Sequence, residues 1–162
     1  MSVHIDKAEI VLLVSLLTNN LHAMELDNHL SVLLVEDDMI ERMKFNRIIE
    51  SSNIKIDLLE ATNGEEALQT LRTTKSLPNI ILLDLNMPRM NGIEFLKILK
   101  KDNRLKFIPT IILTTSNNTK DLLECYNNGI AGYILKPLKY EQYVDKMAIL
   151  LSYWSINELI SK

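Results

Sequence analysis

The segment NIILLDLNMPRMNG, residues 79–92, places a single carboxylate, Asp84, directly after a short apolar run. A loop marked by Pro88 and Gly92 follows this acid. An aspartate at the end of a strand can form a turn, bind a metal ion or act as a nucleophile. The choice among these three roles depends on which other side chains reach the same end of the sheet.

Other apolar runs also end in polar side chains. These are Glu36, Asp37 and Asp38 after residues 31–35, Glu60 at the end of 56–60, Thr114, Thr115 and Ser116 after 110–113, and Lys136 after 132–135. Taken singly, the acids and hydroxyls are residues that form turns and cap helices. Capping does not explain a lysine brought to the same edge, so the whole set favours a functional site.

The apolar runs alternate with segments of helical pattern along the chain. The predicted strands are 31–35, 56–60, 79–83, 110–113 and 132–135, and the predicted helices are 39–51, 62–72, 92–101, 119–128 and a last segment after Pro137. Thr62 and Glu65 have the spacing of a capping box at the start of the second helix. Gly129 is placed to end the fourth helix as a C-terminal cap.

This alternation predicts an α/β fold of five strand–helix units. Strands that are apolar almost throughout indicate a parallel sheet covered by helices on both faces. Right-handed crossovers leave few topologies, and the flavodoxin-like, doubly wound (βα)5 order 2-1-3-4-5 is the natural choice for five units. Its ligand crevice lies at the carboxyl ends of the first and third strands, where Glu36, Asp37 and Asp84 are expected.

Several carboxylates in one crevice repel one another unless a cation compensates them. Oxygen ligands without histidine or cysteine favour a hard ion such as Mg²⁺. An aspartate beside a metal ion, a lysine and a hydroxyl forms a phosphoryl-transfer site, in which the carboxylate attacks phosphorus and becomes an acyl phosphate. The metal ion and the lysine neutralise phosphoryl oxygens, and the hydroxyl donates a hydrogen bond.

The composition narrows the classes of protein. The chain has 162 residues, 47% of them hydrophobic and 24% charged, which suits one globular domain with a short extension. A net charge of −3 provides no general attraction to nucleic acid or to an anionic membrane. The single cysteine, Cys125, excludes an internal disulfide and a cysteine metal cluster, and we expect a cytoplasmic location.

The first 30 residues are predicted to be an extension, helical or disordered, ahead of a domain at 31–155 and a tail or helix end at 156–162. The apolar run at residues 10–17 is too short to cross a bilayer as a helix, which needs about 20 residues. Asp6 and Glu9 before this run disfavour a cleaved signal peptide. An extra helix, or a true start at Met24, are the remaining interpretations.

Four motifs, in this order, carry a family resemblance: VLLVEDD, ILLDLNMPRMNG, PTIILTTS and GYILKP. With them, the chain from about residue 31 to 151 resembles the receiver domain of two-component response regulators. The resemblance covers about three-quarters of the chain and implies phosphorelay signalling. Because only 26 residues follow Lys136, it further implies a stand-alone receiver, similar to the single-domain regulators associated with phytochromes.

The resemblance implies a role for each matching residue. Asp84 corresponds to the phospho-acceptor, Lys136 to the phosphate-pairing lysine and Thr114 to the switch hydroxyl. Asp37 corresponds to a direct Mg²⁺ ligand, Glu36 to a partner that acts mostly through water, and the main-chain carbonyl of Asn86 to the third protein ligand. Asp38 is expected to begin a helix, and a cis peptide is implied before Pro137.

The family also implies a switch. A sensor histidine kinase or a phosphotransfer protein phosphorylates Asp84, Thr114 is drawn to the new charge, and Tyr133 turns inward. The face made by the fourth helix, fifth strand and fifth helix is thereby remodelled. The receiver then loses the phosphoryl group to water at a rate that the side chains at Asn86 and Ser116 tune.

Without an output domain, the output is expected to be a protein contact, including a homodimer through that same face. Six residues suit it: Cys125, Tyr126, Tyr143, Met147, Tyr153 and Trp154. A core position is an alternative for Met147, which we favour, whereas we assign Trp154 to the interface because an aromatic past the sheet has less core to enter.

Other functions fit the residues less well. A phosphatase of the haloacid-dehalogenase type needs a second aspartate two residues after the nucleophile, and Asn86 stands there. A flavin carrier of this fold needs a glycine- and hydroxyl-rich phosphate loop where EDDMIE occurs. A DNA-binding regulator is disfavoured by the negative charge, and a receiver-like module that is never phosphorylated is disfavoured because every chemistry-bearing position is filled.

Overall fold

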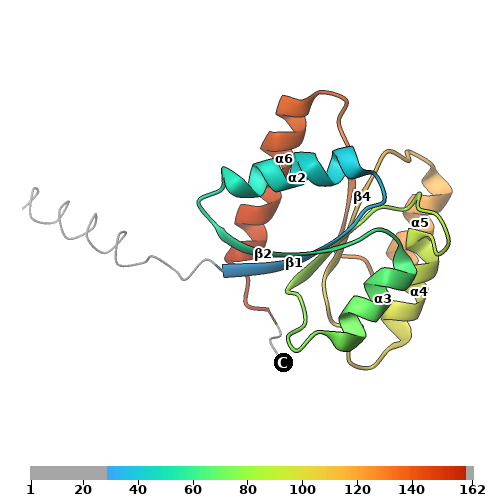
Figure 1. Ribbon diagram of the computed structural model, residues 1–162. Helices are drawn as coiled ribbons and strands as arrows, with labels where there is room; N and C mark the ends of the chain where they lie inside the picture. Colours follow the sequence, from blue (N-terminus) through green and yellow to red (C-terminus); the bar gives the residue numbers. More distant parts are fainter. Residues whose placement is uncertain (1–28, 160–162) are drawn as a thin grey trace, which may run out of the picture.

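The computed structural model describes residues 29–159, which form a five-stranded parallel sheet with helices on both faces (Figure 1). The strand order is β2-β1-β3-β4-β5, which confirms the predicted doubly wound topology. The strands are β1 (His29–Val35), β2 (Lys55–Ala61), β3 (Ile80–Leu83), β4 (Thr110–Thr114) and β5 (Gly132–Leu135). The helices are α2 (Met39–Glu50), α3 (Gly64–Thr73), α4 (Gly92–Lys101), α5 (Thr119–Asn127) and α6 (Tyr140–Ser155).

Two hydrophobic cores lie on opposite faces of the sheet. Helices α2 and α6 cover one face, and α3, α4 and α5 cover the other (Figure 1). Successive side chains of a strand point to opposite faces, so Leu33 and Val35 of β1 enter the core beneath α3 to α5, whereas Val32 and Leu34 enter the core beneath α2 and α6. This double coverage explains why the strand sequences are apolar at almost every position.

The first strand begins two residues earlier than the sequence predicts. His29 and Leu30 already belong to β1, where they pair with β2, and Leu30 is buried. Residues 1–28, including the apolar run at 10–17, lie outside the described residues, so the predicted extension is not described. Helix α6 ends at Ser155, where the predicted domain ends. In the described part of the chain no helix is long and apolar enough to cross a membrane.

The helix ends are set by local hydrogen bonds. Asp38 begins α2 as predicted, because its carboxylate accepts a hydrogen bond from the main-chain N–H of Ile40. The predicted capping box of Thr62 and Glu65 is wrong by one residue. Asn63 is the N-cap of α3 and accepts from Glu66 N–H, while the Glu66 carboxylate accepts from Thr62. Gly129 has the left-handed φ of 76° that ends α5.

Two residues predicted to suit the interface face, Cys125 and Tyr143, lie in the core instead. Met147 is also buried, which confirms the core position favoured for it. The helices carrying them turn these side chains toward the sheet. Burial raises the pKa of the Cys125 thiol to about 11, helped by Asp121 and Glu124, so this thiol stays protonated at neutral pH.

The other three residues stay near the surface. Tyr126 and Tyr153 are exposed, whereas Trp154 is half-buried and packs against the core beneath α2 and α6. The Trp154 ring also contacts the Tyr153 ring edge to face, with centroids 5.3 Å apart. Only Tyr126 and Tyr153 of the predicted set are therefore available in full to a partner.

The peptide bond before Pro137 is trans, so the expected cis bond is wrong for this structure: residues 29–159 contain no cis peptide bond. Either isomer is accessible to a residue before proline, because the two differ by only about 0.5–1 kcal/mol.

Candidate functional site

The register of the sheet brings the strand-end acids together. Val35 of β1 pairs with Leu83 of β3, so the next residues, Glu36 and Asp84, leave the sheet side by side. The main-chain N–H of Asp84 donates to the carbonyl of Val35, and that of Glu36 donates to the carbonyl of Ala61. These two bonds continue the parallel ladder by one residue and fix where both acids point.

Asp84 is a buried carboxylate with one oxygen left without a hydrogen bond. Its side chain Oδ2 accepts from the main-chain N–H of Asn86 at 3.1 Å. Oδ1 has no hydrogen-bond partner among residues 29–159, although it lies 3.7 Å from the Lys136 ammonium. A buried polar atom without a partner costs about 1–3 kcal/mol, and such atoms are rare in native structures. This cost indicates that Oδ1 is kept for a ligand or a reaction.

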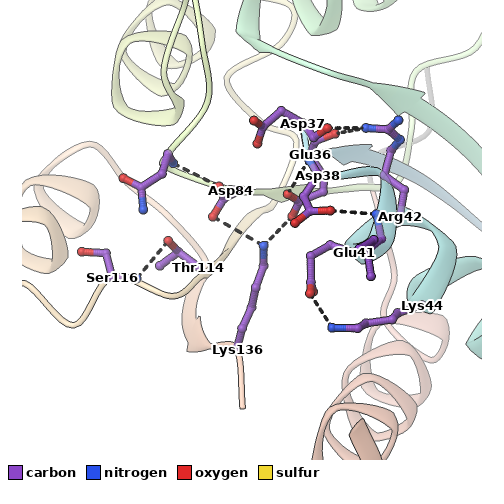
Figure 2. A network of polar contacts seen from close by, with 12 residues as sticks. Glu36, Asp37, Asp38, Glu41, Arg42, Lys44, Asp84, Thr114, Ser116 and Lys136 are labelled. Atoms are coloured by element: carbon purple, nitrogen blue, oxygen red, sulfur yellow. Dashed lines mark hydrogen bonds and ion pairs between the residues drawn. The ribbon is translucent and has the colours of Figure 1, made fainter. Parts of the chain in front are cut away.

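Lys136 lies between two acids. Its ammonium donates to Glu36 Oε2 at 2.5 Å and points toward Asp84, as Figure 2 shows. Both side chains of the Lys136–Glu36 pair are more than nine-tenths buried. Burial alone would lower the pKa of Lys136, but the Glu36 carboxylate, together with Asp84, outweighs burial and raises that pKa above its usual value. Lys136 is therefore a fixed positive charge at neutral pH.

Three carboxylates converge beside this lysine. Oxygen atoms of Glu36, Asp37 and Asp84 all lie within 4.8 Å of one another. Such a set, with no nitrogen or sulfur ligand in it, suits a hard divalent cation that takes oxygen ligands. The charges support this fit, because three carboxylates beside one ammonium leave a net negative charge that a cation would compensate. Asp37 and Asn86 also line one surface hollow together.

The hydroxyl side of the site is built from β4. Thr114 is buried at the end of this strand, and its hydroxyl accepts a hydrogen bond from the main-chain N–H of Ser116. The Ser116 hydroxyl donates to Asp121 in α5, and the Ser116 carbonyl accepts from the Tyr133 hydroxyl at 2.9 Å. The Tyr133 ring packs against the core beneath α3 to α5. Tyr133 is therefore already tied to the loop that Thr114 begins.

Most of the residues predicted for the site are brought together by the fold, and three other strand-end residues are not part of it. Asp38 caps a helix, Glu60 accepts from Asn46, and Thr115 is exposed. The structure also adds Arg42, whose guanidinium donates to the carbonyls of Glu36 and Asp37. No motif marks Arg42 in the sequence; only its position one helical turn after the acids places it there.

The family model of the response regulator receiver domain matches residues 32–148 of this chain. The chain belongs to the response regulator receiver family.

Sequence similarity to two regulatory proteins supports this assignment. The chain is 33% identical over 135 residues to the probable methanogenesis regulatory protein FilR2 of Methanothrix harundinacea, covering 81% of this chain and 87% of that protein. It is 30% identical over 128 residues to the response regulator Rcp1 of Synechocystis, covering 76% and 87% of the two chains. The receiver is therefore a component of two-component signalling.

Solved receiver structures share the fold over nearly their whole length. The phosphorylated cyanobacterial phytochrome response regulator RcpA superimposes with a TM-score of 0.77 at 31% identity, covering 81% of this chain and 98% of that one. The Mn²⁺-bound form of Rcp1 superimposes with a TM-score of 0.75 at 29% identity, covering 81% and 99%. The similarity to RcpA, a phytochrome response regulator, agrees with the predicted resemblance to phytochrome-associated regulators.

The loop after Asp84 in this receiver leaves no space for a side chain at Gly92. A Cβ there would stand 2.2 Å from the carbonyl oxygen of Asp84 and 2.8 Å from the Cα of Leu85. The Gly92 N–H also donates to the Leu85 carbonyl, which holds this close approach in place. The loop therefore packs directly against the backbone of Asp84 and Leu85.

We expect Gly92→Ala to destabilise the receiver by about 1–3 kcal/mol or more, because backbone atoms must move to admit the methyl group. Urea unfolding followed by circular dichroism measures this change. Gly132→Ala is the matched control, since its Cβ would meet only a side-chain methyl of Ile111 at an ordinary 3.6 Å. Equal stability of Gly92→Ala and Gly132→Ala would contradict this prediction.

Proposed function

We propose that this receiver accepts a phosphoryl group on Asp84 from a phosphohistidine, with Mg²⁺ bound at the acidic cluster. The observation that carries this proposal is Asp84 Oδ1, a buried carboxylate oxygen without a hydrogen bond, beside a fixed ammonium and two further acids. Oδ1 attacks phosphorus, a P–O bond forms as the P–N bond of the phosphohistidine breaks, and the imidazole leaves.

Glu36, Asp37 and Asp84 supply the carboxylates that would hold the ion, and the main-chain carbonyl of Asn86 is the proposed further ligand. When bound, the ion neutralises charge on the phosphoryl oxygens. Lys136 supplies a second positive charge 3.7 Å from the acceptor oxygen. Thr114, whose hydroxyl can donate once its loop moves, is the proposed partner of a phosphoryl oxygen. The Mn²⁺-bound Rcp1 and phosphorylated RcpA support this chemistry by similarity.

The experiment that tests the proposal is incubation with acetyl phosphate, with Mg²⁺ or with a chelator, followed by mass spectrometry of the intact protein. A gain of one phosphoryl group that requires Mg²⁺ is the expected result. If the folded protein gains no phosphoryl group in the presence of Mg²⁺, Asp84 is not a phosphoryl acceptor. The chain would then be better explained as a binding module that is never phosphorylated.

The proposed phosphodonor is a sensor histidine kinase or a phosphotransfer protein. Exposed apolar side chains lie on the segments that follow the site acids and the site lysine: Met39, Ile40 and Met43 of α2, Leu138 just before α6, and Tyr140 at its start. Exposed apolar side chains at the rim of a polar site suit the docking of a protein donor. A match to part of the sensor histidine kinase CheAY of Helicobacter pylori, at 34% identity over 110 residues, supports this class of partner. Labelling by acetyl phosphate but by no phosphorylated histidine protein of the same cell would contradict it.

The proposed output is a change on the face formed by α5, β5 and α6. Phosphorylation gives Thr114 a new partner, and the Thr114 loop is bonded to Tyr133 of β5 through Ser116. Exposed apolar side chains lie along this face: Leu123 and Tyr126 of α5, Leu135 of β5, and Ile149 and Tyr153 of α6. We propose that they bind a protein partner or a second copy of the chain. Loss of the phosphoryl group to water, tuned by the Asn86 and Ser116 side chains, would end the signal.

For the homodimer, we expect beryllofluoride, which mimics the phosphoryl group, to shift the mass in solution from monomer toward dimer. Ile149→Asp should prevent the shift, because a carboxylate on an apolar interface must lose its water. Met43→Asp, an equally charged change at an exposed apolar residue of α2, serves as the control. Light scattering coupled to gel filtration gives the masses. An unchanged dimer in Ile149→Asp would exclude this face as the dimer contact.

A further inference from the structure

Among the residues that the structure describes, the Asp37 carboxylate lacks the hydrogen bonds that hold the other two carboxylates of the cluster in place. The Glu36 carboxylate is bonded to Lys136 and to the main-chain N–H of Asp38, and the Asp84 carboxylate is bonded to Asn86 N–H. The Asp37 side chain is exposed, and within residues 29–159 its carboxylate makes no hydrogen bond or ion pair. Within the described residues, therefore, only the main chain of Asp37 constrains where this carboxylate can point.

Arg42 fixes that main chain on both sides of Asp37. One guanidinium nitrogen, Nη1, donates to the carbonyl of Glu36 at 2.8 Å and to the carbonyl of Asp37 at 2.9 Å. These carbonyls belong to the peptide groups immediately before and after the Cα of Asp37. Holding both groups restricts the two backbone dihedrals of Asp37, and with them the direction of its Cα–Cβ bond.

The helix holds Arg42 in turn. The Arg42 N–H donates to the Asp38 carbonyl, the first hydrogen bond of α2, and its own carbonyl accepts from the Asn46 side chain. Figure 2 shows the guanidinium on one side of the main chain and the Asp37 carboxylate pointing away from it. Arg42 therefore binds the main chain on the side opposite the Asp37 carboxylate. The carboxylate oxygens stay free to face Asp84.

We infer that Arg42 is a positioning residue for the cation site: its guanidinium presets the Asp37 carboxylate to bind a divalent ion. Mutating a group that orients a metal ligand typically lowers metal affinity about 10- to 100-fold. Arg42 touches neither the acceptor carboxylate nor the proposed ion. This inference rests on the proposed function, since the ion it concerns is the one proposed at the acidic cluster.

The test is Mg²⁺ affinity of the unphosphorylated protein, measured by titration calorimetry, in Arg42→Met and Arg42→Lys. We expect Arg42→Met to weaken Mg²⁺ binding about tenfold or more, and Arg42→Lys, which keeps a donor, to recover part of the loss. Removing a positive charge near a cation site would by itself strengthen binding, so weaker binding cannot come from the lost charge. Arg47→Met, which removes an exposed arginine later in α2, is the matched control.

Thermal unfolding separates positioning from a purely structural role. If Arg42 only stabilises the fold, Arg42→Met lowers the unfolding temperature while its Mg²⁺ affinity equals that of Arg47→Met, and the inference is overturned. Tighter binding in Arg42→Met would overturn it as well. If the unchanged protein itself binds no Mg²⁺, the proposed function fails first, and the two failures are thereby distinguished.

Discussion

Replacing Asp84 with asparagine is expected to abolish the Mg²⁺-dependent gain of a phosphoryl group from acetyl phosphate. The amide has the size of the carboxylate and keeps an oxygen to accept from Asn86 N–H, but it is not a nucleophile at phosphorus. The change also removes one of three clustered negative charges, so we expect stability to be retained or to rise. Intact mass spectrometry and a urea unfolding curve measure the two effects.

Asp38→Asn is the matched control for this experiment. Asp38 stands next to the cluster but serves as the N-cap of α2, a position at which asparagine is as good as aspartate. Labelling of Asp38→Asn should equal that of the unchanged protein. If Asp84→Asn were labelled at the normal rate, the acceptor would be another residue, and the buried oxygen Oδ1 would need a different explanation.

Replacing Lys136 with methionine is expected to impair both labelling and stability. Removing one partner of a buried ion pair costs about 3–5 kcal/mol, because the remaining charge is left without compensation. Here two buried carboxylates, Glu36 and Asp84, lose their ammonium together. The labelling rate should fall about 10²- to 10³-fold, the effect of removing one group that stabilises developing charge. Lys120→Met, at an exposed lysine of α5, is the control for the loss of charge.

The stability loss should depend on pH in a defined direction. In Lys136→Met, burial and the Asp84 charge both raise the pKa of Glu36 above its ordinary value near 4.5, and the opposing lysine is gone. A folded-state pKa above the unfolded value means that the proton stabilises the fold. The contribution of Glu36 to the variant's stability is therefore fully present below pH 4.5 and is lost as the pH rises through the raised pKa of Glu36.

Urea unfolding in a chelator at a series of pH values checks this dependence. The double variant Glu36→Gln/Lys136→Met should recover much of the stability at neutral pH, because it leaves one fewer buried charge. A deficit in Lys136→Met that is the same from pH 4 to pH 8 would show that lost packing, and not the ion pair, explains the destabilisation.

The sequence by itself determined the order of the elements and the edge at which the site forms. Strands buried on both faces must be apolar at nearly every position, and the strands at residues 80–83 and 110–114 follow this pattern. Parallel strands release their carboxyl ends at one edge, so Glu36, Asp84, Thr114 and Lys136 had to meet there. The N-cap role of Asp38 followed from residue type and position alone.

Only the tertiary structure decided which atoms pair at that edge and which side chains turn inward. Lys136 bonds to Glu36, one hundred residues earlier, more closely than to the acceptor, and Tyr133 bonds to a carbonyl across 17 residues. Cys125 is buried although it resembled an interface residue in the sequence. The spacing of apolar residues shows only roughly which side of a helix faces the core. The choice of hydrogen-bond partner depends on small differences in the distance between atoms. Such distances depend on how the whole sheet and its helices pack, so no local pattern contains them.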